Sequence, residues 1–271
     1  YPYYKLPSLF FNKYLEKNFP EIDNYLSILS LKKLSQKVSK NIGEADVLIA
    51  QSTAGLEAGK KIKILGGKFI CDRASTHILV QNETLKEAYN DLNMKFNGIS
   101  DDIIDREINE YNDANIISVP STFALNSFLK KGFDRKKLFL NPFGVDLQRF
   151  TPLPKIKSNK FQVLYVGNLS VRKGIIYLLE AFKKLNFKNK ELILIGSIEH
   201  NIKEKVFKYF SENIKYLSTI KNSQLNVYYS NANVTVQPSL EDGFNMVIAE
   251  SLACGCPVIA TKNTGAPDFF N

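Results

Sequence analysis

A repeated alternation of short apolar runs with helical stretches is the feature that most constrains how this 271-residue chain can fold. Runs rich in Val and Ile, such as ADVLIA at 45–50 and NIISV at 115–119, are each followed by a stretch with helical spacing of apolar residues. Strands that alternate with helices in this way form βαβ units, in which the strands are parallel. The sequence therefore predicts an α/β fold with mostly parallel sheets.

The alternation is interrupted once, at residues 151–160, where the sequence TPLPKIKSNK has two prolines and no apolar period. This composition is typical of a linker. Apolar runs then restart with FQVLYV at 161–166 and ELILI at 191–195. We therefore expect two α/β domains, at 1–152 and 161–271, with a linker at 153–160.

Both ends of the chain look incomplete. The first forty residues are expected to be helical or irregular, without the opening strand and glycine-rich turn usual in such a domain, and the chain begins with YPYY rather than Met. The second domain stops where another helix should begin. We therefore expect a fragment of a longer protein, with both domains partial, and this truncated chain could itself be inactive.

Composition limits the classes of partner. No run of about 18 apolar residues occurs, so no membrane span is predicted. A net charge of +9 is compatible with nucleic acid, an acidic membrane surface or a phosphorylated substrate. However, the lysines are spread among asparagines without a basic stripe, so we expect no nucleic acid. Cys71, Cys254 and Cys256 lack metal-ligand spacing and are expected to be structural thiols in a reducing compartment.

The segment QPSLEDGFNMVIAE at 237–250 reads as the end of a buried strand, an acidic turn and a helix, for which Gly255 would supply the C-cap. Ligands of α/β sheets lie at such strand ends, where the N–H groups of residues 244–246 would face an anion such as a diphosphate. Asp242 and Glu250 lie two helical turns apart near one face. They would accept hydrogen bonds from hydroxyl groups, because diphosphate oxygens would repel carboxylates. Alternatively, Asp242 only caps the helix and Glu250 is a solvated helix residue.

The segment VGNLSVRKG at 166–174 lies between the first strand and the first helix of the second domain. Gly167 permits close backbone approach, and the adjacent Arg172 and Lys173 could hold phosphates. The spacing matches neither a Walker P-loop nor a dinucleotide-binding fingerprint, so a solvated basic turn is the alternative.

Three stretches in order, NPFGVDLQRFTP (141–152), VLYVGNLSVRKGIIYLLEAF (163–182) and QPSLEDGFNMVIAESLACGCPVIAT (237–261), together resemble glycosyltransferase family 4. The resemblance runs from about residue 45 to the end. It implies the GT-B fold, two Rossmann-like domains that face each other across a cleft. It also implies transfer of a sugar from a UDP- or GDP-type donor to a carbohydrate, lipid or other hydroxyl acceptor, with retention of configuration. No metal or other cofactor is implied, because a positively charged site does that work.

The resemblance also assigns roles in the second domain. The acid-x7-acid motif of the family matches Asp242, for the donor sugar hydroxyls, and Glu250, for the ribose. Lys173 matches the diphosphate-binding lysine, and Arg172 would be the second cation because Asn168 replaces a frequent Arg. Asn245 replaces the usual Gly. The donor-binding set is completed by Gly167, Asn168, Gly243, Phe244, Asn245, Met246 and, in the loop at 216–220 expected under the nucleobase, Ile220.

In the first domain the resemblance is weaker. His77 follows a strand where the family often has a His near the donor sugar, although an ordinary loop histidine is the alternative. Arg73 and Ser121 are expected on the acceptor side. Ser121 is also predicted to cap the helix that ends at Gly132.

Two other functions remain open. A non-catalytic nucleotide-binding module would have the same motifs, and a GT-B-like sugar-nucleotide epimerase would need further acid–base groups in the first domain, where no clear set is found. We expect a cytoplasmic location. A basic first domain could also rest on the anionic inner face of a membrane.

Overall fold

The computed structural model describes residues 20–96 and 98–269, so the opening YPYY lies outside the described residues. The chain divides into two compact units. The first unit comprises 1–82, 97–119 and 125–141, and the second comprises 83–96, 120–124 and 142–271. Two helices, α4 (Ile78–Asp91) and α6 (Thr122–Lys130), carry the chain between the units.

The first unit contains a four-stranded parallel sheet in the order β1-β2-β3-β4. One face is buried, where Phe69 and Ile117 are fully covered together with Ile62 of α3 and Tyr111 of α5. Val47 and Ile49, on the edge strand, are exposed. The elements are β1 (Val47–Gln51), β2 (Lys68–Asp72), β3 (Ile116–Val119), β4 (Leu138–Leu140), α2 (Pro20–Asn41), α3 (Leu56–Ile64) and α5 (Asp101–Asp113).

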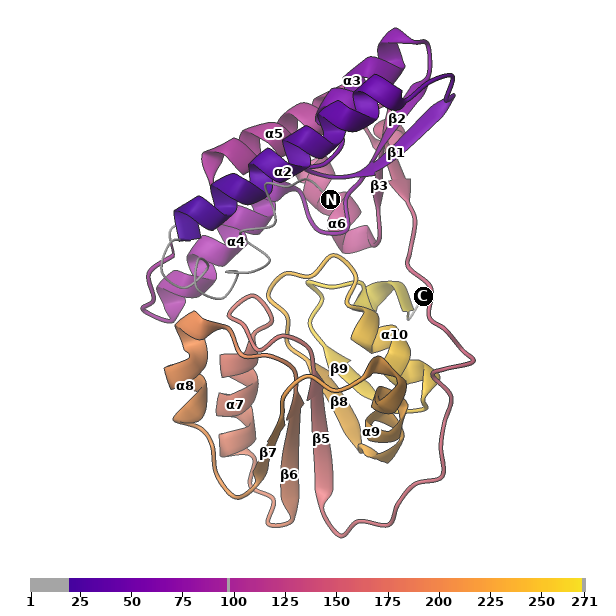
Figure 1. The fold of residues 1–271 in the computed structure, drawn as a ribbon. Helices are drawn as coiled ribbons and strands as arrows, with labels where there is room; N and C mark the ends of the chain where they lie inside the picture. The colour runs from indigo at the N-terminus through magenta and orange to yellow at the C-terminus, as the bar shows by residue number, and fades with distance from the viewer. Residues whose placement is uncertain (1–19, 97, 270–271) are drawn as a thin grey trace. The chain divides into compact units, whose positions relative to one another are not determined.

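The second unit contains a five-stranded parallel sheet in the order β7-β6-β5-β8-β9 (Figure 1). Because β5 comes first in the chain and β6 and β8 flank it, the strand order reverses beside β5. The elements are β5 (Phe161–Val166), β6 (Lys190–Ile195), β7 (Ile214–Leu217), β8 (Val234–Gln237), β9 (Val258–Ala260), α7 (Ile175–Lys184), α8 (Lys203–Phe207), α9 (Leu225–Asn231) and α10 (Met246–Ala253).

Helices cover both faces of this second sheet. Alternate residues of β5 point to opposite sides, so Tyr165 packs in the cluster that contains α7 and α8, whereas Leu164 packs with Tyr229 of α9 and the end of α10. Tyr89, from the segment 83–96, joins the first cluster. The apolar strands are therefore buried on both faces, as a parallel sheet requires.

The structure confirms the predicted fold class. β5 occupies the predicted residues, and α10 ends before Gly255, which has a φ of 73°. The predicted loop at 216–220 was wrong in its first residues, because Tyr216 and Leu217 belong to β7. The segment 153–160 contains no helix or strand. All three cysteines are buried and free.

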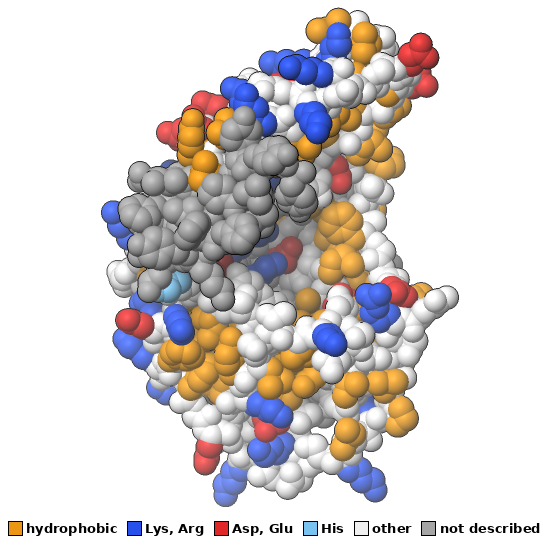
Figure 2. Space-filling model, viewed as in Figure 1, with side chains coloured by type: hydrophobic (Ala, Val, Ile, Leu, Met, Phe, Trp, Pro, Cys, Tyr) orange, Lys and Arg blue, Asp and Glu red, His pale blue; other side chains and the backbone are white. Residues whose placement is uncertain are grey.

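Two surface properties complete the description. No helix within 20–96 and 98–269 is long and apolar enough to cross a membrane. On the face drawn in Figure 2, Lys and Arg side chains are scattered rather than gathered into one stripe.

Candidate functional site

Two turns meet at the carboxyl edge of the second sheet, where the strand order reverses. We call residues 167–174, after β5, the basic turn, and residues 238–245, after β8, the acidic turn. The amide of Leu240 donates to the carbonyl of Arg172 over 2.9 Å. Gly174 has a φ of 68°, and a Cβ there would lie 2.0 Å from the carbonyl oxygen of Pro238. The two turns are therefore packed backbone against backbone, at the position where α/β sheets bind ligands.

The charged residues of these turns form two ion pairs. Nε of Arg172 donates to Oε2 of Glu241 over 2.7 Å, and Nζ of Lys173 donates to Oδ2 of Asp242. Glu241 is completely buried, whereas the side chains of Arg172 and Lys173 are 34% and 23% exposed. Two positive and two negative charges thus lie side by side, with the cations closer to solvent.

Asp242 also contacts the entry of α10. Its Oδ1 accepts hydrogen bonds from the amides of Phe244 and Asn245, at 3.4 and 3.2 Å. These bonds close the turn before the helix, whose N-cap residue is Asn245 without a side-chain cap hydrogen bond, so Asp242 is not the cap considered from the sequence. Two of the three amides expected to face a ligand point at Asp242, and Met246 begins the helix at the surface.

Asn245 occupies the helix entry with a φ of 66°. Its side-chain amide donates to Oε1 of Gln237 and to Oγ of Ser239, at 3.1 and 3.3 Å. Asparagine is among the few non-glycine residues that adopt this backbone region readily. Its side chain is turned into the protein, which explains how it can stand where the resemblance expects Gly.

Glu250 lies on α10 and is 8% exposed. Its Oε2 accepts a hydrogen bond of 2.7 Å from the hydroxyl of Tyr229. Burial raises the pKa of Glu250, and the hydrogen bond from Tyr229 opposes this shift. Glu250 is thus a buried carboxylate held from α9, not the solvated helix residue considered as the alternative.

The remaining second-unit residues lie around the same edge or core. Gly167 follows β5, and its amide donates to Ile195. Asn168 is bonded to neighbouring loops, because its amide donates to Glu199 over 3.0 Å and its Oδ1 accepts from Ser197. Other predicted members are Gly243, buried in the acidic turn; Phe244, whose ring lies between Phe143 and Phe269; and Ile220, partly buried against the core.

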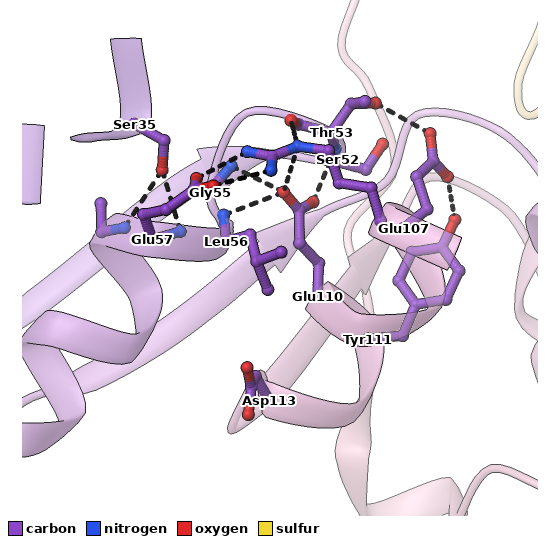
Figure 3. Close-up of polar contacts among 12 residues, drawn as sticks. Ser35, Ser52, Thr53, Gly55, Leu56, Glu57, Glu107, Glu110, Tyr111 and Asp113 are labelled. Carbon is purple, nitrogen blue, oxygen red and sulfur yellow. Dashed lines mark hydrogen bonds and ion pairs between the residues drawn. The ribbon is translucent and has the colours of Figure 1, made fainter. Parts of the chain in front are cut away.

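In the first unit, Arg73 belongs to an internal polar network. Its guanidinium donates to Glu107 over 2.9 Å and to Gln81 over 2.8 Å. Glu107 in turn accepts from the hydroxyls of Thr53 and Tyr111 (Figure 3). These bonds hold Arg73 inside the unit, and its predicted role toward an acceptor stays a prediction.

Glu110 is the most constrained acid of this network. Its carboxylate accepts hydrogen bonds from the amides of Thr53, Gly55 and Leu56, at 2.6, 2.9 and 2.9 Å, in the loop that follows β1 (Figure 3). Burial raises the pKa of Glu110 to about 7, against the lowering effect of the backbone amides and of Arg106. No spacing in the sequence indicates this contact, because the partners lie more than fifty residues away.

His77 and Ser121 were also predicted as site residues. The ring of His77 packs against Tyr111 and Phe128, with centroids 5.1 and 5.0 Å apart, and its Nδ1 accepts from the amide of Leu79. Oγ of Ser121 accepts from the amide of Ala124, which confirms the predicted N-cap. The structure thus gives both side chains local structural contacts, and their functional roles remain predictions.

The structure therefore brings together Arg172, Lys173 and Asp242, with Glu250 on the helix that follows. The sequence missed Glu241 as the partner of Arg172, and Tyr229 as the partner of Glu250. Within the described residues, no group of three or more His, Cys, Asp and Glu side chains could hold a metal ion.

Fold and site together define an α/β protein of the class that binds its ligand where the strand order of a parallel sheet reverses. Comparison with known proteins then indicates a family. Residues 150–271 match the family model for glycosyl transferases group 1.

Among the relatives, the capsular polysaccharide biosynthesis glycosyltransferase CapM of Staphylococcus aureus is 35% identical over 118 residues, 42% of this chain and 31% of CapM. The putative colanic acid biosynthesis glycosyltransferase WcaL of Escherichia coli K12 is 26% identical over 152 residues, 52% of this chain and 37% of WcaL.

Among solved structures, Anabaena HepE in complex with UDP and glucose matches with a TM-score of 0.65 and 19% identity. The match covers 88% of this chain and 65% of HepE, and it confirms the two-domain GT-B fold. The matched region spans about a third of the length of CapM and WcaL.

Proposed function

We propose that this chain is the donor-binding part of a glycosyltransferase that moves a sugar from a UDP-type donor to a hydroxyl acceptor. The observation that carries the proposal is the pairing of a basic and an acidic turn, Arg172-Lys173 against Glu241-Asp242, where the strand order reverses. This pairing lies within the residues that match the family model for glycosyl transferases group 1.

The two turns offer complementary groups to such a donor. The ammonium group of Lys173 has several N–H donors, so it can contact a phosphate oxygen while it stays beside Asp242. Asp242 and Glu250 accept hydrogen bonds, which suits sugar and ribose hydroxyls. UDP is the preferred nucleotide because the related fold of HepE was solved with UDP and glucose bound.

The charge pattern also supports a mechanism. When the bond between the sugar and the diphosphate breaks, negative charge develops on the leaving diphosphate, and Arg172 and Lys173 stabilise it. We propose retention of configuration, in which the leaving diphosphate accepts the proton of the incoming hydroxyl on the same face of the sugar. No carboxylate nucleophile and no metal ion are required, because the two side-chain cations serve the leaving group.

The names of the relatives support one class of acceptor. CapM and WcaL are named for the biosynthesis of capsular polysaccharide and colanic acid. We therefore propose a hydroxyl group of a growing carbohydrate, free or lipid-linked, as the acceptor. We propose that the protein binds its donor in the cytoplasm, at or near the inner face of the membrane.

Transfer by the complete gene product tests this proposal. With a panel of UDP- and GDP-sugars, Lys173→Ala and Glu250→Ala should each lower kcat/KM by about 100-fold, since each removes a charged contact to the donor. Glu212→Ala, an exposed acid of the same unit, is the matched control and should keep full turnover. EDTA should leave the rate unchanged.

Two outcomes would contradict the proposal. Full turnover in both Lys173→Ala and Glu250→Ala would show that the site is elsewhere. UDP binding without turnover on any donor would favour the non-catalytic nucleotide-binding module.

A further inference from the structure

Tyr229 and Glu250 form a buried pair beside the candidate site. We infer that Tyr229 is a positioning residue, which holds the carboxylate of Glu250 so that one oxygen faces the ribose diol of the donor. The inference rests on the proposed function. In this account the Tyr229–Glu250 pair, and not Glu250 alone, selects a nucleotide that has both ribose hydroxyls.

The contact is direct and enclosed. The hydroxyl of Tyr229 donates to Oε2 of Glu250 over 2.7 Å, and Tyr229 is completely buried. A buried carboxylate oxygen without a partner is costly, so this hydrogen bond stabilises one orientation of the carboxylate strongly. Oε2 therefore already accepts a hydrogen bond within the protein.

The other oxygen is available. No described residue donates a hydrogen bond to Oε1 of Glu250, and Oε1 is not among the buried side-chain atoms without a partner within the described ranges. Oε1 therefore still reaches solvent. With Oε2 fixed, the plane of the carboxylate is set, and the two in-plane lone pairs of Oε1 can accept a hydrogen bond from each of two neighbouring hydroxyls.

The surroundings fix the tyrosine as well. Tyr229 lies on α9 within the apolar cluster of the second unit, and the ring of Phe150 packs against it edge-on with centroids 6.0 Å apart. The amide of Leu153 donates to Ser230, the next residue of α9. Burial raises the pKa of Glu250, and the positive charge of Arg149 opposes this rise because it favours the ionised form. The segment 149–153 is thus bonded to α9, whose Tyr229 holds the carboxylate of Glu250.

The test compares UDP with 2′-deoxy-UDP as ligands of the complete gene product, by titration calorimetry. Natural protein should prefer UDP. Tyr229→Phe removes only the hydroxyl oxygen, so affinity for UDP should fall by about tenfold while affinity for 2′-deoxy-UDP changes little. Tyr228→Phe, which changes the neighbouring tyrosine of α9, is the matched control and should keep the preference.

A pH series adds a readout that a purely structural role would not change. Tyr229→Phe removes a hydrogen bond that lowers the pKa of Glu250, so the loss of UDP affinity on acidification should begin at higher pH than in natural protein. If Tyr229→Phe does not fold, 3-fluorotyrosine at position 229 replaces it. Its stronger hydroxyl donor should increase the preference for UDP.

The outcomes separate the two proposals. Natural protein that does not bind UDP would overturn the proposed function. UDP binding with the same ribose preference in natural protein and Tyr229→Phe, or in the fluorotyrosine protein if that is the one that folds, would overturn the positioning role and leave the proposed function standing.

Discussion

At the scale of single residues, the partners of the charged side chains decide what each can do. Arg172 and Lys173 were predicted from the sequence as adjacent cations. Their partners, Glu241 and Asp242, lie in the turn that follows another strand, 69 positions along the chain. The sequence showed both pairs of charges. Only the order of strands in the second sheet brings them together.

Asn245 shows a local limit of the same kind. The sequence marked it as a departure from the expected Gly. Its side-chain hydrogen bonds to Gln237 and Ser239 depend on how the acidic turn folds, and no spacing rule predicts them. Arg73 is similar, because its partner Glu107 lies 34 positions away.

Glu110 leads to a prediction about stability. Its pKa is about 7 in the folded unit and near 4.5 in an unfolded chain. Between these values the folded state binds more protons, so the free energy of unfolding should fall as pH rises from about 4.5 to about 7 and then level off. The total contribution is at most about 3 kcal/mol.

Chemical denaturation of natural protein and Glu110→Gln at pH 5 and pH 8 measures this effect. Natural protein should lose more stability between the two pH values than Glu110→Gln, which has no carboxyl group to titrate at that position. The same pH dependence in both proteins would show that Glu110 is already ionised at pH 5.

At the scale of elements, most helices and strands were predictable because apolar periodicity is strong in a parallel α/β fold. The miss at β7 has a physical reason. The strand is short, contains Lys215 and lies at the sheet edge, where it is only partly buried. Its sequence therefore lacks the continuous apolar run that marked β5 and β6.

The contact between the two turns gives a prediction at this scale. Gly174→Ala should destabilise the protein by at least about 2 kcal/mol, because the new Cβ would meet the carbonyl of Pro238 in a backbone region that disfavours side chains. Gly132→Ala is the matched control. It has a φ of 85° but no atom within 4 Å of the new Cβ, so it should cost only about 1 kcal/mol. Equal losses in thermal unfolding would mean that the turns are not in contact.

At the scale of the whole molecule, the alternation of runs predicted two α/β domains, whose bounds stay a prediction, and the comparisons confirm the fold class. The donor half was easier to interpret than the first unit, because its motifs lie in consecutive turns of one sheet. In the first unit, Arg73 and His77 follow a strand as a ligand-binding residue would, yet their described contacts belong to a buried network and an aromatic cluster. In the first unit, a position at the end of a strand is therefore a weaker indicator of a ligand-binding residue.

The central claim is that the basic turn binds the diphosphate of a UDP-type donor. Calorimetric binding of UDP and uridine to natural protein, Lys173→Ala and Lys160→Ala tests it most directly. Lys160 pairs with Glu191 outside the two turns and serves as the control. We expect Lys173→Ala to weaken UDP binding by about 10- to 100-fold, with uridine binding and Lys160→Ala unaffected. Unchanged UDP affinity in Lys173→Ala would contradict the account.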